Sequence, residues 1–297
     1  MPALRSWIRY ASVVFAMATA GCSDWFDRRP AVARPSVGLS RSALPLGAPL
    51  EMTLRFDVSP TAPPLAKDYR VMVHFLFDNG ELMRAYDHDP PTPTRLWGPG
   101  RSVTYTRRLF VPQYPYVGAV PIVVGLYSAA SGERLRLSGD DVGQRAYKVA
   151  TLMLEPQAPS SFLVFKEGWY RAEYSTASHI EWRWTGPEAS LAFRNPRRHS
   201  ILYLQLDGRP DLFETPQQVS LAIGDRIIQS FPVRSTEPVF QELALSAADL
   251  GATDQVRLTL KVDKTFVPAE LPGAEGSDKR VLGIRVYHAF LEPRSES

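Results

Sequence analysis

The stretch Leu50-Glu51-Met52-Thr53-Leu54-Arg55-Phe56-Asp57-Val58 alternates strictly between apolar and polar residues. Successive side chains of a β-strand point to opposite faces, so this pattern predicts a strand with one face in a core and the other in water. Strand-like runs rich in Val, Ile, Phe and Tyr follow over residues 69–78, 102–111, 121–128 and 147–154. Breaks that carry Pro or Gly separate these runs, a combination typical of an antiparallel β-sandwich.

The clearest turn in this half of the chain is Asp78-Asn79-Gly80-Glu81, which predicts a β-hairpin. If Asn79 and Gly80 alone form the turn, the numbers of cross-strand partners sum to about 159. His74 then faces Ala85, and His88 faces Val71. Positions 71 and 74 differ in parity, so the two histidines are expected on opposite faces of the sheet, where they could not share a metal ion.

The second half of the chain shows the same alternation after a break at Ala158-Pro159-Ser160-Ser161. The only helix expected here is short, over residues 246–250, with Ser246 as N-cap and Gly251 as the stop. The remaining elements are predicted strands, over residues 161–166, 180–184, 189–194, 200–206, 218–223, 226–233, 239–245, 255–262 and 281–291.

The fold prediction is therefore all-β, with two tandem antiparallel β-sandwiches. An immunoglobulin- or fibronectin-like sandwich is expected over residues 36–156 and a larger, jelly-roll-like one over residues 160–292. No internal repeat aligns the two halves, so we expect two different sandwiches. The linker between them is only a few residues long, and we expect the two domains to touch.

The N-terminus has the layout of a secretory signal peptide. Arg5 and Arg9 precede a mostly apolar stretch over residues 10–17, and Ala18-Thr19-Ala20-Gly21 leads to Cys22. A transmembrane helix needs about 20 apolar residues, and this stretch is too short for one. We expect residues 1–21 to be removed as a signal and residues 22–35, which are polar and lack a sustained period, to form a tether.

The Ala-Gly-Cys ending resembles the lipobox of bacterial lipoproteins, with Thr19 where that motif usually has Leu. The resemblance implies a thioether-linked diacylglycerol on Cys22 and stable anchoring in a membrane. The alternative is an ordinary secretory signal with a chance cysteine after it. Ser23 stands where an inner-membrane retention signal would have Asp, so the resemblance implies a location in the bacterial cell envelope, on the outer membrane.

Composition limits the remaining functions. Cys22 is the only cysteine, so with lipid on it no disulfide, zinc thiolate or cysteine nucleophile is expected. Removing Arg5 and Arg9 with the signal leaves 34 − 2 = 32 basic against 31 acidic residues, a net charge of +1. There is no basic run, and nucleic acid is not an expected partner.

Catalytic and metal-binding motifs are missing from the sequence. We find no Gly-x-Ser-x-Gly elbow, His-Glu-x-x-His, P-loop or Rossmann glycine turn. Asp87 and Asp89 are a candidate metal site, but they flank a Pro-Pro turn, where an Asp side chain usually bonds its own backbone. Asp140-Asp141 is an equally weak candidate for a metal site. We therefore expect a protein that is not an enzyme and has no cofactor and no metal. An active site formed by residues that are distant in sequence, such as a pair of carboxylates, stays open. With 31 acidic residues in the chain, the sequence cannot exclude such a pair.

Two groups of segments resemble known modules. The segments Val73-His74-Phe75, Asp87-His88-Asp89-Pro90-Pro91 and Gly125-Leu126-Tyr127-Ser128 resemble an immunoglobulin-like module of bacterial envelope proteins, also found next to membrane glycosyltransferases. The segments Glu167-Gly168-Trp169-Tyr170, Arg183-Trp184-Thr185-Gly186 and Thr265-Phe266-Val267-Pro268 are similar to a jelly-roll-like module in the same company. By association, the resemblance implies an envelope setting concerned with glycans.

Trp169, Arg183 and Glu167 are the candidate glycan-binding residues, because they lie in the densest cluster of aromatic and charged side chains. Trp182 and Trp184 share one strand face and Arg183 points to the other. Each Trp is either packed in a core or part of an exposed platform for sugar rings. Asp278 and Arg280 share a face and form either an ion pair or a ligand contact.

Two hypotheses of different class follow. The first is a non-enzymatic glycan-binding lipoprotein that uses its second sandwich. The second is a structural or assembly lipoprotein that holds a protein partner in an envelope export or polysaccharide machine. Tryptophans exposed together in a groove favour the first, and buried tryptophans beside a broad apolar patch favour the second.

Overall fold

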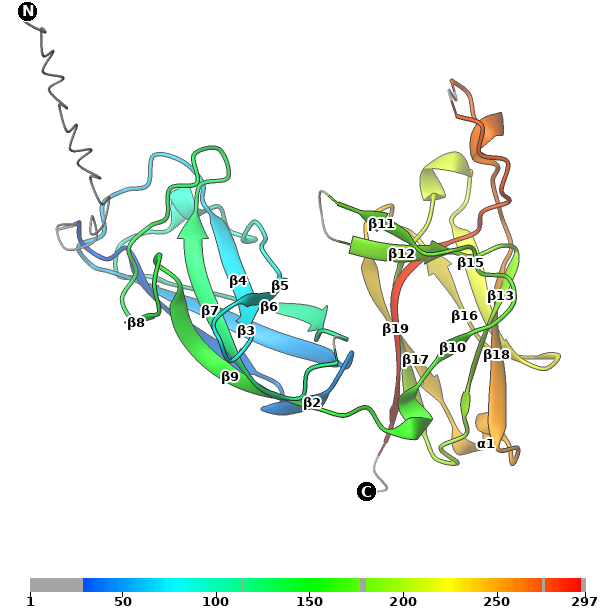
Figure 1. Ribbon diagram of the computed structural model, residues 1–297. Helices are drawn as coiled ribbons and strands as arrows, with labels where there is room; N and C mark the ends of the chain where they lie inside the picture. Colours follow the sequence, from blue (N-terminus) through cyan, green and yellow to red (C-terminus); the bar gives the residue numbers. More distant parts are fainter. Residues whose placement is uncertain (1–28, 114, 177–179, 274–275, 295–297) are drawn as a thin grey trace, which may run out of the picture.

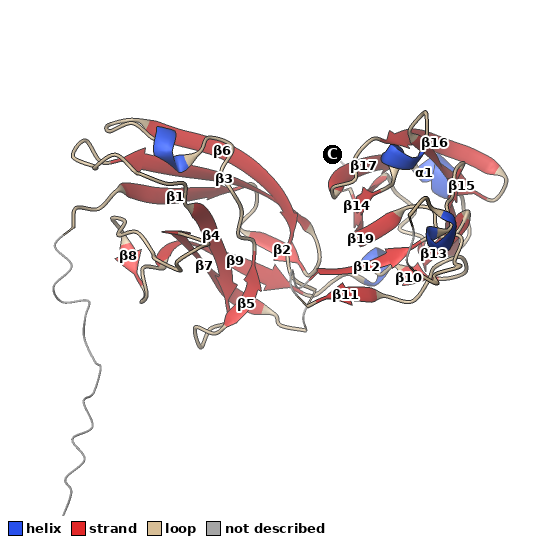
Figure 2. Ribbon diagram, turned by 90° about the horizontal axis from the view of Figure 1, so that it is seen from above, coloured by secondary structure: helices blue, strands red, loops and turns tan. Residues whose placement is uncertain are grey.

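The computed structural model describes residues 29–113, 115–176, 180–273 and 276–294. The signal peptide and Cys22 lie outside the described residues, so their predicted roles stay predictions. The described chain is all-β and forms two β-sandwiches that lie side by side (Figure 1, Figure 2). The predicted fold class is confirmed.

The first sandwich consists of a three-stranded sheet packed against a larger one. The smaller sheet has the order β1-β3-β6, with β1 (Ala33–Leu39), β3 (Pro49–Val58) and β6 (Ser102–Phe110). The larger sheet has the order β2-β9-β7-β4-β5, with β8 (Asp140–Asp141) on β9; its strands are β2 (Ala43–Pro45), β9 (Tyr147–Glu155), β7 (Gly118–Tyr127), β4 (Arg70–Leu76) and β5 (Leu82–Ala85). All pairs are antiparallel except β2 with β9. Strand β1 begins at Ala33, three residues before the predicted start of this domain and inside the predicted tether.

The stretch that predicted the fold forms β3, and its two faces differ as expected. Leu50, Leu54 and Phe56 are buried in the first core, whereas Glu51 and Arg55 on the other face are exposed. Burial of such large apolar side chains contributes about 1.5–3 kcal/mol each, which is why a strict alternation specifies the register of the strand.

The hairpin between β4 and β5 has the predicted register but a longer turn. His74 pairs with Ala85, and Val71 pairs with His88, as predicted. The assumed two-residue turn is wrong, because Leu76 pairs with Leu82 and five residues lie between them. A register shift between Phe75 and Leu76 absorbs the difference, so the histidines still lie on opposite faces.

The second sandwich packs two five-stranded antiparallel sheets face to face, in a jelly-roll-like arrangement. The first sheet has the order β10-β13-β18-β15-β16, with β10 (Val164–Phe165), β13 (Glu188–Arg194), β18 (Gln255–Val262), β15 (Gln217–Ile223) and β16 (Arg226–Val233). The second has the order β11-β12-β19-β14-β17, with β11 (Glu173–Ser175), β12 (Ile180–Trp184), β19 (Arg285–Pro293), β14 (Ser200–Asp207) and β17 (Val239–Leu245).

The predicted short helix is present as α1 (Ala247–Leu250). Ser246 caps it: its hydroxyl accepts a hydrogen bond from the backbone N–H of Asp249 at 3.0 Å, and the Asp249 carboxylate accepts one from the N–H of Ser246 at 3.0 Å. Gly251 ends the helix with φ +67°, a conformation that glycine adopts without strain. The other helical segments of the described chain are single 3-10 turns over Thr94–Leu96, Pro159–Ser161, Pro210–Leu212 and Pro268–Glu270.

The β14–β17–β19 part of the second sheet is covered on both faces. Leu202, Leu204 and Leu291 point into the second core. On the opposite face, Tyr203 and Phe290 pair with each other and pack into the core of the first domain. The two domains are therefore in contact, as expected, through one face of a sheet.

Candidate functional site: a pocket at the domain junction

A pocket of about 140 Å³ lies where the two sandwiches meet. The first domain contributes strands β3 and β6 and the loop before β2, and the second contributes β14 and β17. The pocket therefore exists only in the assembled two-domain chain. Its lining residues are Ser40, Arg41, Pro49, Leu50, Glu51 and Arg108 from the first domain and Tyr203, Phe240 and Glu242 from the second.

Arg108 connects the two walls of the pocket. Its Nε donates to Glu51 Oε2 at 3.2 Å within the first domain, and its Nη1 donates to Glu242 Oε1 at 2.6 Å in the second. All three side chains are about half exposed. Exposed ion pairs of this kind add little to stability, about 0–1 kcal/mol, so Arg108 presents its charge to the pocket at small cost to the fold.

A second guanidinium crosses the junction beside the pocket. Arg41 pairs with Glu292 of β19 and also donates from Nη2 to the backbone carbonyl of Pro49 at 3.3 Å. The hydroxyl of Tyr203 also bonds to Glu292, and burial raises the pKa of Tyr203 to about 12. Tyr203 is therefore a neutral donor at neutral pH.

Aromatic rings hold the junction together next to the pocket. Phe240 stacks on Phe110 of the first domain with ring centroids 4.6 Å apart, and His288 stacks on the same ring at 3.9 Å. Nε2 of His288 donates to the carbonyl oxygen of Gly47 at 2.8 Å. Gly47 has φ +75°, and a Cβ there would lie 2.9 Å from the Gln113 side chain, so only glycine fits this position. Burial lowers the pKa of His288 to about 4, so it is neutral at neutral pH.

The lining of the pocket is aromatic and charged. It has two aromatic rings, two guanidinium groups and two carboxylates, and it contains one serine, Ser40, whose Oγ accepts a hydrogen bond from the backbone N–H of Glu51 at 3.2 Å. A glycosidase needs a general acid in an apolar setting. Glu51 and Glu242 are exposed and both bind Arg108, which is the opposite setting.

Trp169, a predicted site residue, packs at the edge of the second sandwich. It is half-buried against the second core, and its indole Nε1 donates to the carbonyl oxygen of Ser190 at 2.7 Å. Its ring meets the edge of Phe165 at 4.8 Å. Both the apolar surface and the polar group of the indole thus have partners inside the domain.

Arg183 and Glu167 complete the predicted set, and the structure gives them different partners. The guanidinium of Arg183 lies 5.1 Å from the centre of the Phe165 ring, so Arg183 and Trp169 both contact Phe165. Glu167 instead pairs with Arg257 of β18 at 2.8 Å, and both are exposed. Phe165, which joins the cluster, was not singled out from the sequence. Glycan binding by Trp169, Arg183 and Glu167 stays a prediction.

Trp182 and Trp184 lie on the strand face opposite Arg183, as predicted, because successive side chains of β12 alternate between its two faces. Across to β19, Arg183 pairs with Val286 and Trp184 with Arg285. Trp184 is buried and Trp182 half-buried. The guanidinium of Arg285 lies over both indoles, 5.4 and 5.6 Å from their centres, and pairs with the buried Asp207 at 2.6 Å. Both indoles are therefore covered by the Arg285 side chain and do not form an exposed platform for sugar rings. Asp278 and Arg280 form an ion pair at 2.7 Å.

The histidine and carboxylate cluster of the first domain has structural partners. Nδ1 of His88 donates to the Tyr86 carbonyl at 3.0 Å, and its Nε2 accepts from the Tyr105 hydroxyl at 2.8 Å. Burial lowers the pKa of His88 to about 4. On the other face, His74 pairs with Asp87 at 3.2 Å. Among the described residues, no three His, Cys, Asp or Glu side chains gather as a metal site.

The residues that line the pocket come from four separate parts of the chain, and none of them was predicted to be a site residue. The signal that could have located the junction is the segment Ile201-Leu202-Tyr203-Leu204, which is apolar at consecutive positions. Such a run is typical of a strand buried on both faces. It therefore indicates that a second body covers β14.

Comparison with known proteins leaves the family open. No protein-family model and no curated protein matches the chain.

Among the described residues, no helix has the length and apolar character needed to cross a membrane.

Several solved structures are similar to a limited degree. The tandem carbohydrate-binding modules of a family 98 glycoside hydrolase from Streptococcus pneumoniae match at 7% identity and TM-score 0.24, over 83% of this chain and 84% of that one. An N-terminal tandem of such modules from Paenibacillus barcinonensis matches at 8% and 0.24, over 89% and 93%. A Pseudomonas fluorescens alkylpurine DNA glycosylase matches at 17% and 0.27, over 42% of this chain and only 30% of the glycosylase. Identities and TM-scores this low carry no argument about this chain.

Proposed function

We propose that the protein binds a saccharide, without catalysis, in the pocket between its two sandwiches. The observation that carries the proposal is the lining: two aromatic rings, two guanidinium groups and two carboxylates surround about 140 Å³. A sugar ring offers an apolar face to an aromatic side chain and hydroxyl groups to charged donors and acceptors. Among the lining residues, Phe240 supplies the first kind of contact, and Arg108 and Glu242 supply the second.

The experiment uses Arg108, because its ion pairs are exposed and its replacement is expected to leave the fold intact. Arg108→Gln should weaken binding of a saccharide identified on a glycan array by about tenfold, the effect of losing a hydrogen bond to a charged group. Arg55→Gln is the matched control, because Arg55 on the neighbouring strand also pairs with a carboxylate and has the same 53% exposure as Arg108. Isothermal titration of both variants tests the proposal. Equal affinity of Arg108→Gln and Arg55→Gln would contradict it.

The second part of the proposal is a lipid anchor on Cys22 that holds the protein in the bacterial envelope, on the outer membrane. Its support is the charged, apolar and small-residue order of residues 5–21 before the only cysteine. Mass spectrometry of the membrane-extracted protein should find a diacylglyceryl or triacyl group on Cys22. A soluble mature protein with unmodified Cys22 would contradict this part.

The second candidate function is an assembly role that holds a protein partner. It is favoured by three exposed apolar side chains in the domain linker and edge strand β10, namely Phe162, Val164 and Phe165. In cells, a photo-crosslinking residue at position 164 should then capture one discrete partner, and Phe162→Ser should abolish this capture. Capture that is lost in Arg108→Gln and retained in Phe162→Ser would argue against this role.

A further inference from the structure

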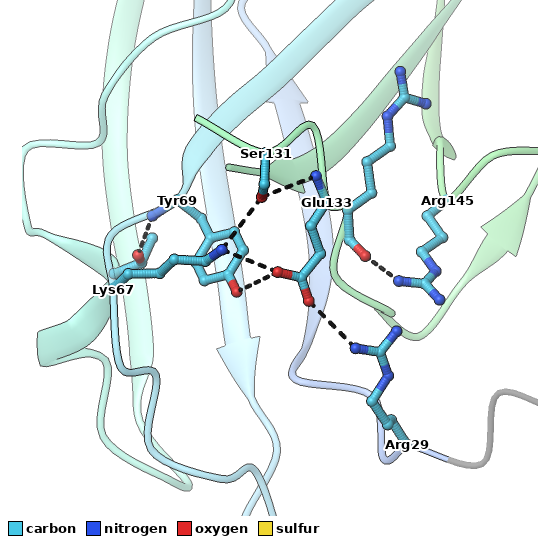
Figure 3. A network of polar contacts seen from close by, with 8 residues as sticks. Arg29, Lys67, Tyr69, Ser131, Glu133 and Arg145 are labelled. Carbon is cyan, nitrogen blue, oxygen red and sulfur yellow. Dashed lines mark hydrogen bonds and ion pairs between the residues drawn. The ribbon is translucent and has the colours of Figure 1, made fainter. Parts of the chain in front are cut away.

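The folded first domain begins very close to the predicted anchor. The Arg29 guanidinium pairs with Glu133 at 3.3 Å, and Nη1 of Arg136 donates to the backbone carbonyl of Arg29 at 2.9 Å. Figure 3 shows Glu133 between Arg29 and Lys67, with the Tyr69 hydroxyl donating to the same carboxylate. The chain is therefore held by the domain from Arg29 onward.

This contact lies at one end of the first sandwich, which we call the N-terminal pole. It comprises the start of β1 and the loops over residues 59–69, 86–101 and 128–146. The second domain contacts the other end, through Gly47 and Phe110. Figure 2 shows β8 and the 3-10 turn beside β6 at the end of the first sandwich away from the second. The junction pocket and the N-terminal pole are thus on opposite ends of this domain.

Two loops of the N-terminal pole present apolar side chains to solvent. Leu96 is 65% exposed, more than any other large apolar side chain described, and Val142 is 51% exposed. The loop that carries Leu96 is firmly held, because its neighbour Trp97 is buried against Phe56 with ring centroids 4.9 Å apart. The exposure of Leu96 is therefore a property of a well-packed loop rather than of a loose one.

The loop that carries Val142 is held in the same way. The backbone N–H of Val142 donates to the carbonyl of Ala146 at 2.9 Å, and Asp141 accepts from the N–H of Gly143 at 2.9 Å. Nη1 of Arg134 donates to the carbonyl of Gln144 at 2.8 Å. Two rigid loops thus hold separate apolar tips at the same pole.

We infer that the N-terminal pole rests on the phospholipid surface that holds Cys22, with Leu96 and Val142 inserted at the boundary of headgroups and acyl chains. The inference rests on the proposed lipid anchor. Only residues 23–28 separate Cys22 from Arg29, a reach of about 25 Å when fully extended. At that distance the tether gives the loops a high effective concentration at the surface, so weak insertion of two side chains suffices.

Charge has a minor part in this contact. Lys67 pairs with Glu133 at 3.0 Å and Arg95 pairs with Asp68 at 2.7 Å, so two of the cations at the pole are neutralised within the protein. The apolar tips are the feature that water solvates poorly. The contact is therefore expected on vesicles of neutral phosphatidylcholine as well as on anionic ones.

The test places a fluorophore at the tips of the full lipidated protein. Leu96→Cys and Val142→Cys are labelled with an environment-sensitive dye, and the proteins are inserted in phosphatidylcholine vesicles that contain a lipid with a spin label in its acyl chain. Leu82→Cys is the matched control, since Leu82 is 52% exposed and lies after the hairpin at the other end of the sandwich. A lipidated Cys22 is a thioether and takes no dye.

Several-fold stronger quenching at positions 96 and 142 than at position 82 is the expected result. Equal quenching at the three positions, or stronger quenching at 82, overturns the inference while leaving the anchor intact, provided that the protein floats with the vesicles. Protein that remains in the soluble fraction overturns the anchor and, with it, this inference. Vesicle flotation therefore distinguishes a failure of the loop insertion from a failure of the lipid anchor.

Discussion

The edge of the second sandwich and the domain junction contain similar side chains. At the edge these side chains pack against one another, and at the junction they line a pocket. At the edge, Trp169 and Arg183 meet on Phe165, and the indole N–H is bound to Ser190 within the same domain. At the junction, Arg108 spans two domains around an open volume of about 140 Å³. The cluster at the edge is packed within one domain, whereas the side chains around the junction pocket come from two domains and leave part of their surface open. Dense clusters of aromatic and charged residues thus predict packing better than they predict a ligand site.

The largest effect that separates these regions is expected at Trp169. Trp169→Ala should lower the free energy of unfolding by about 2–4 kcal/mol, because it removes core packing and one of the two hydrogen bonds to the Ser190 carbonyl, which keeps the N–H of Lys166 as a donor. Urea unfolding measures this loss. Below the unfolding transition, saccharide binding should persist. If Trp169→Ala lost saccharide binding without losing stability, the edge of the second sandwich would be the better candidate for the glycan site.

The next largest effect is the pH dependence of the unfolding free energy, which tests whether the junction buries His288. His288 has its pKa lowered to about 4 by burial, against 6.5 in the unfolded chain. Between these values the unfolded chain binds more protons, so stability present above pH 6.5 is lost as the pH falls toward 4. We expect His288 to account for about 2 kcal/mol of this loss by about pH 4.5.

The variant His288→Phe isolates this contribution. It keeps a ring for the stack on Phe110 but removes the titrating group. Urea unfolding of the variant should show a shallower dependence on pH between 6.5 and 4, while His88, whose pKa is also lowered to about 4, retains its part. An identical pH dependence in the two proteins would mean that the junction does not bury His288 in solution.

A smaller effect is expected at Arg183. Arg183→Gln removes the cation from the Phe165 ring and should cost about 0.5–1 kcal/mol, the strength of a partly exposed cation–π contact. Saccharide affinity should stay the same, in contrast to Arg108→Gln. A loss of affinity in Arg183→Gln as large as that in Arg108→Gln would break the distinction between the two regions.

The smallest effect is expected at Glu167. Its partner Arg257 and Glu167 itself are both exposed, so Glu167→Gln should change the unfolding free energy by less than about 0.5 kcal/mol. Binding on the glycan array should also be unchanged. A clear loss of signal on the array with normal melting behaviour would show that Glu167 contacts a ligand.

The elements that the sequence predicted best are those with local causes. Alternation over residues 50–58 predicted β3, the Ser246 cap predicted α1, and parity placed His74 and His88 on opposite faces. Each depends on a period or on a hydrogen bond between near neighbours. Even the wrong turn length left the register intact, because a bulge compensated for it.

The junction pocket had no comparable local signal. Arg41, Arg108, Tyr203 and Phe240 come together only after two domains have folded and docked. Sequence spacing cannot encode the angle between two sandwiches. The two-sided apolar run in β14 indicated that something covers this strand, but not which surface does so.

The most direct test of the central claim is hydrogen–deuterium exchange of the protein with and without a saccharide identified on the array. We expect added protection on both walls of the junction, in peptides that contain Glu51, Arg108 and Phe240, and none in the peptide over residues 164–169. Protection confined to residues 164–169 and 180–184, with the junction unchanged, would contradict it.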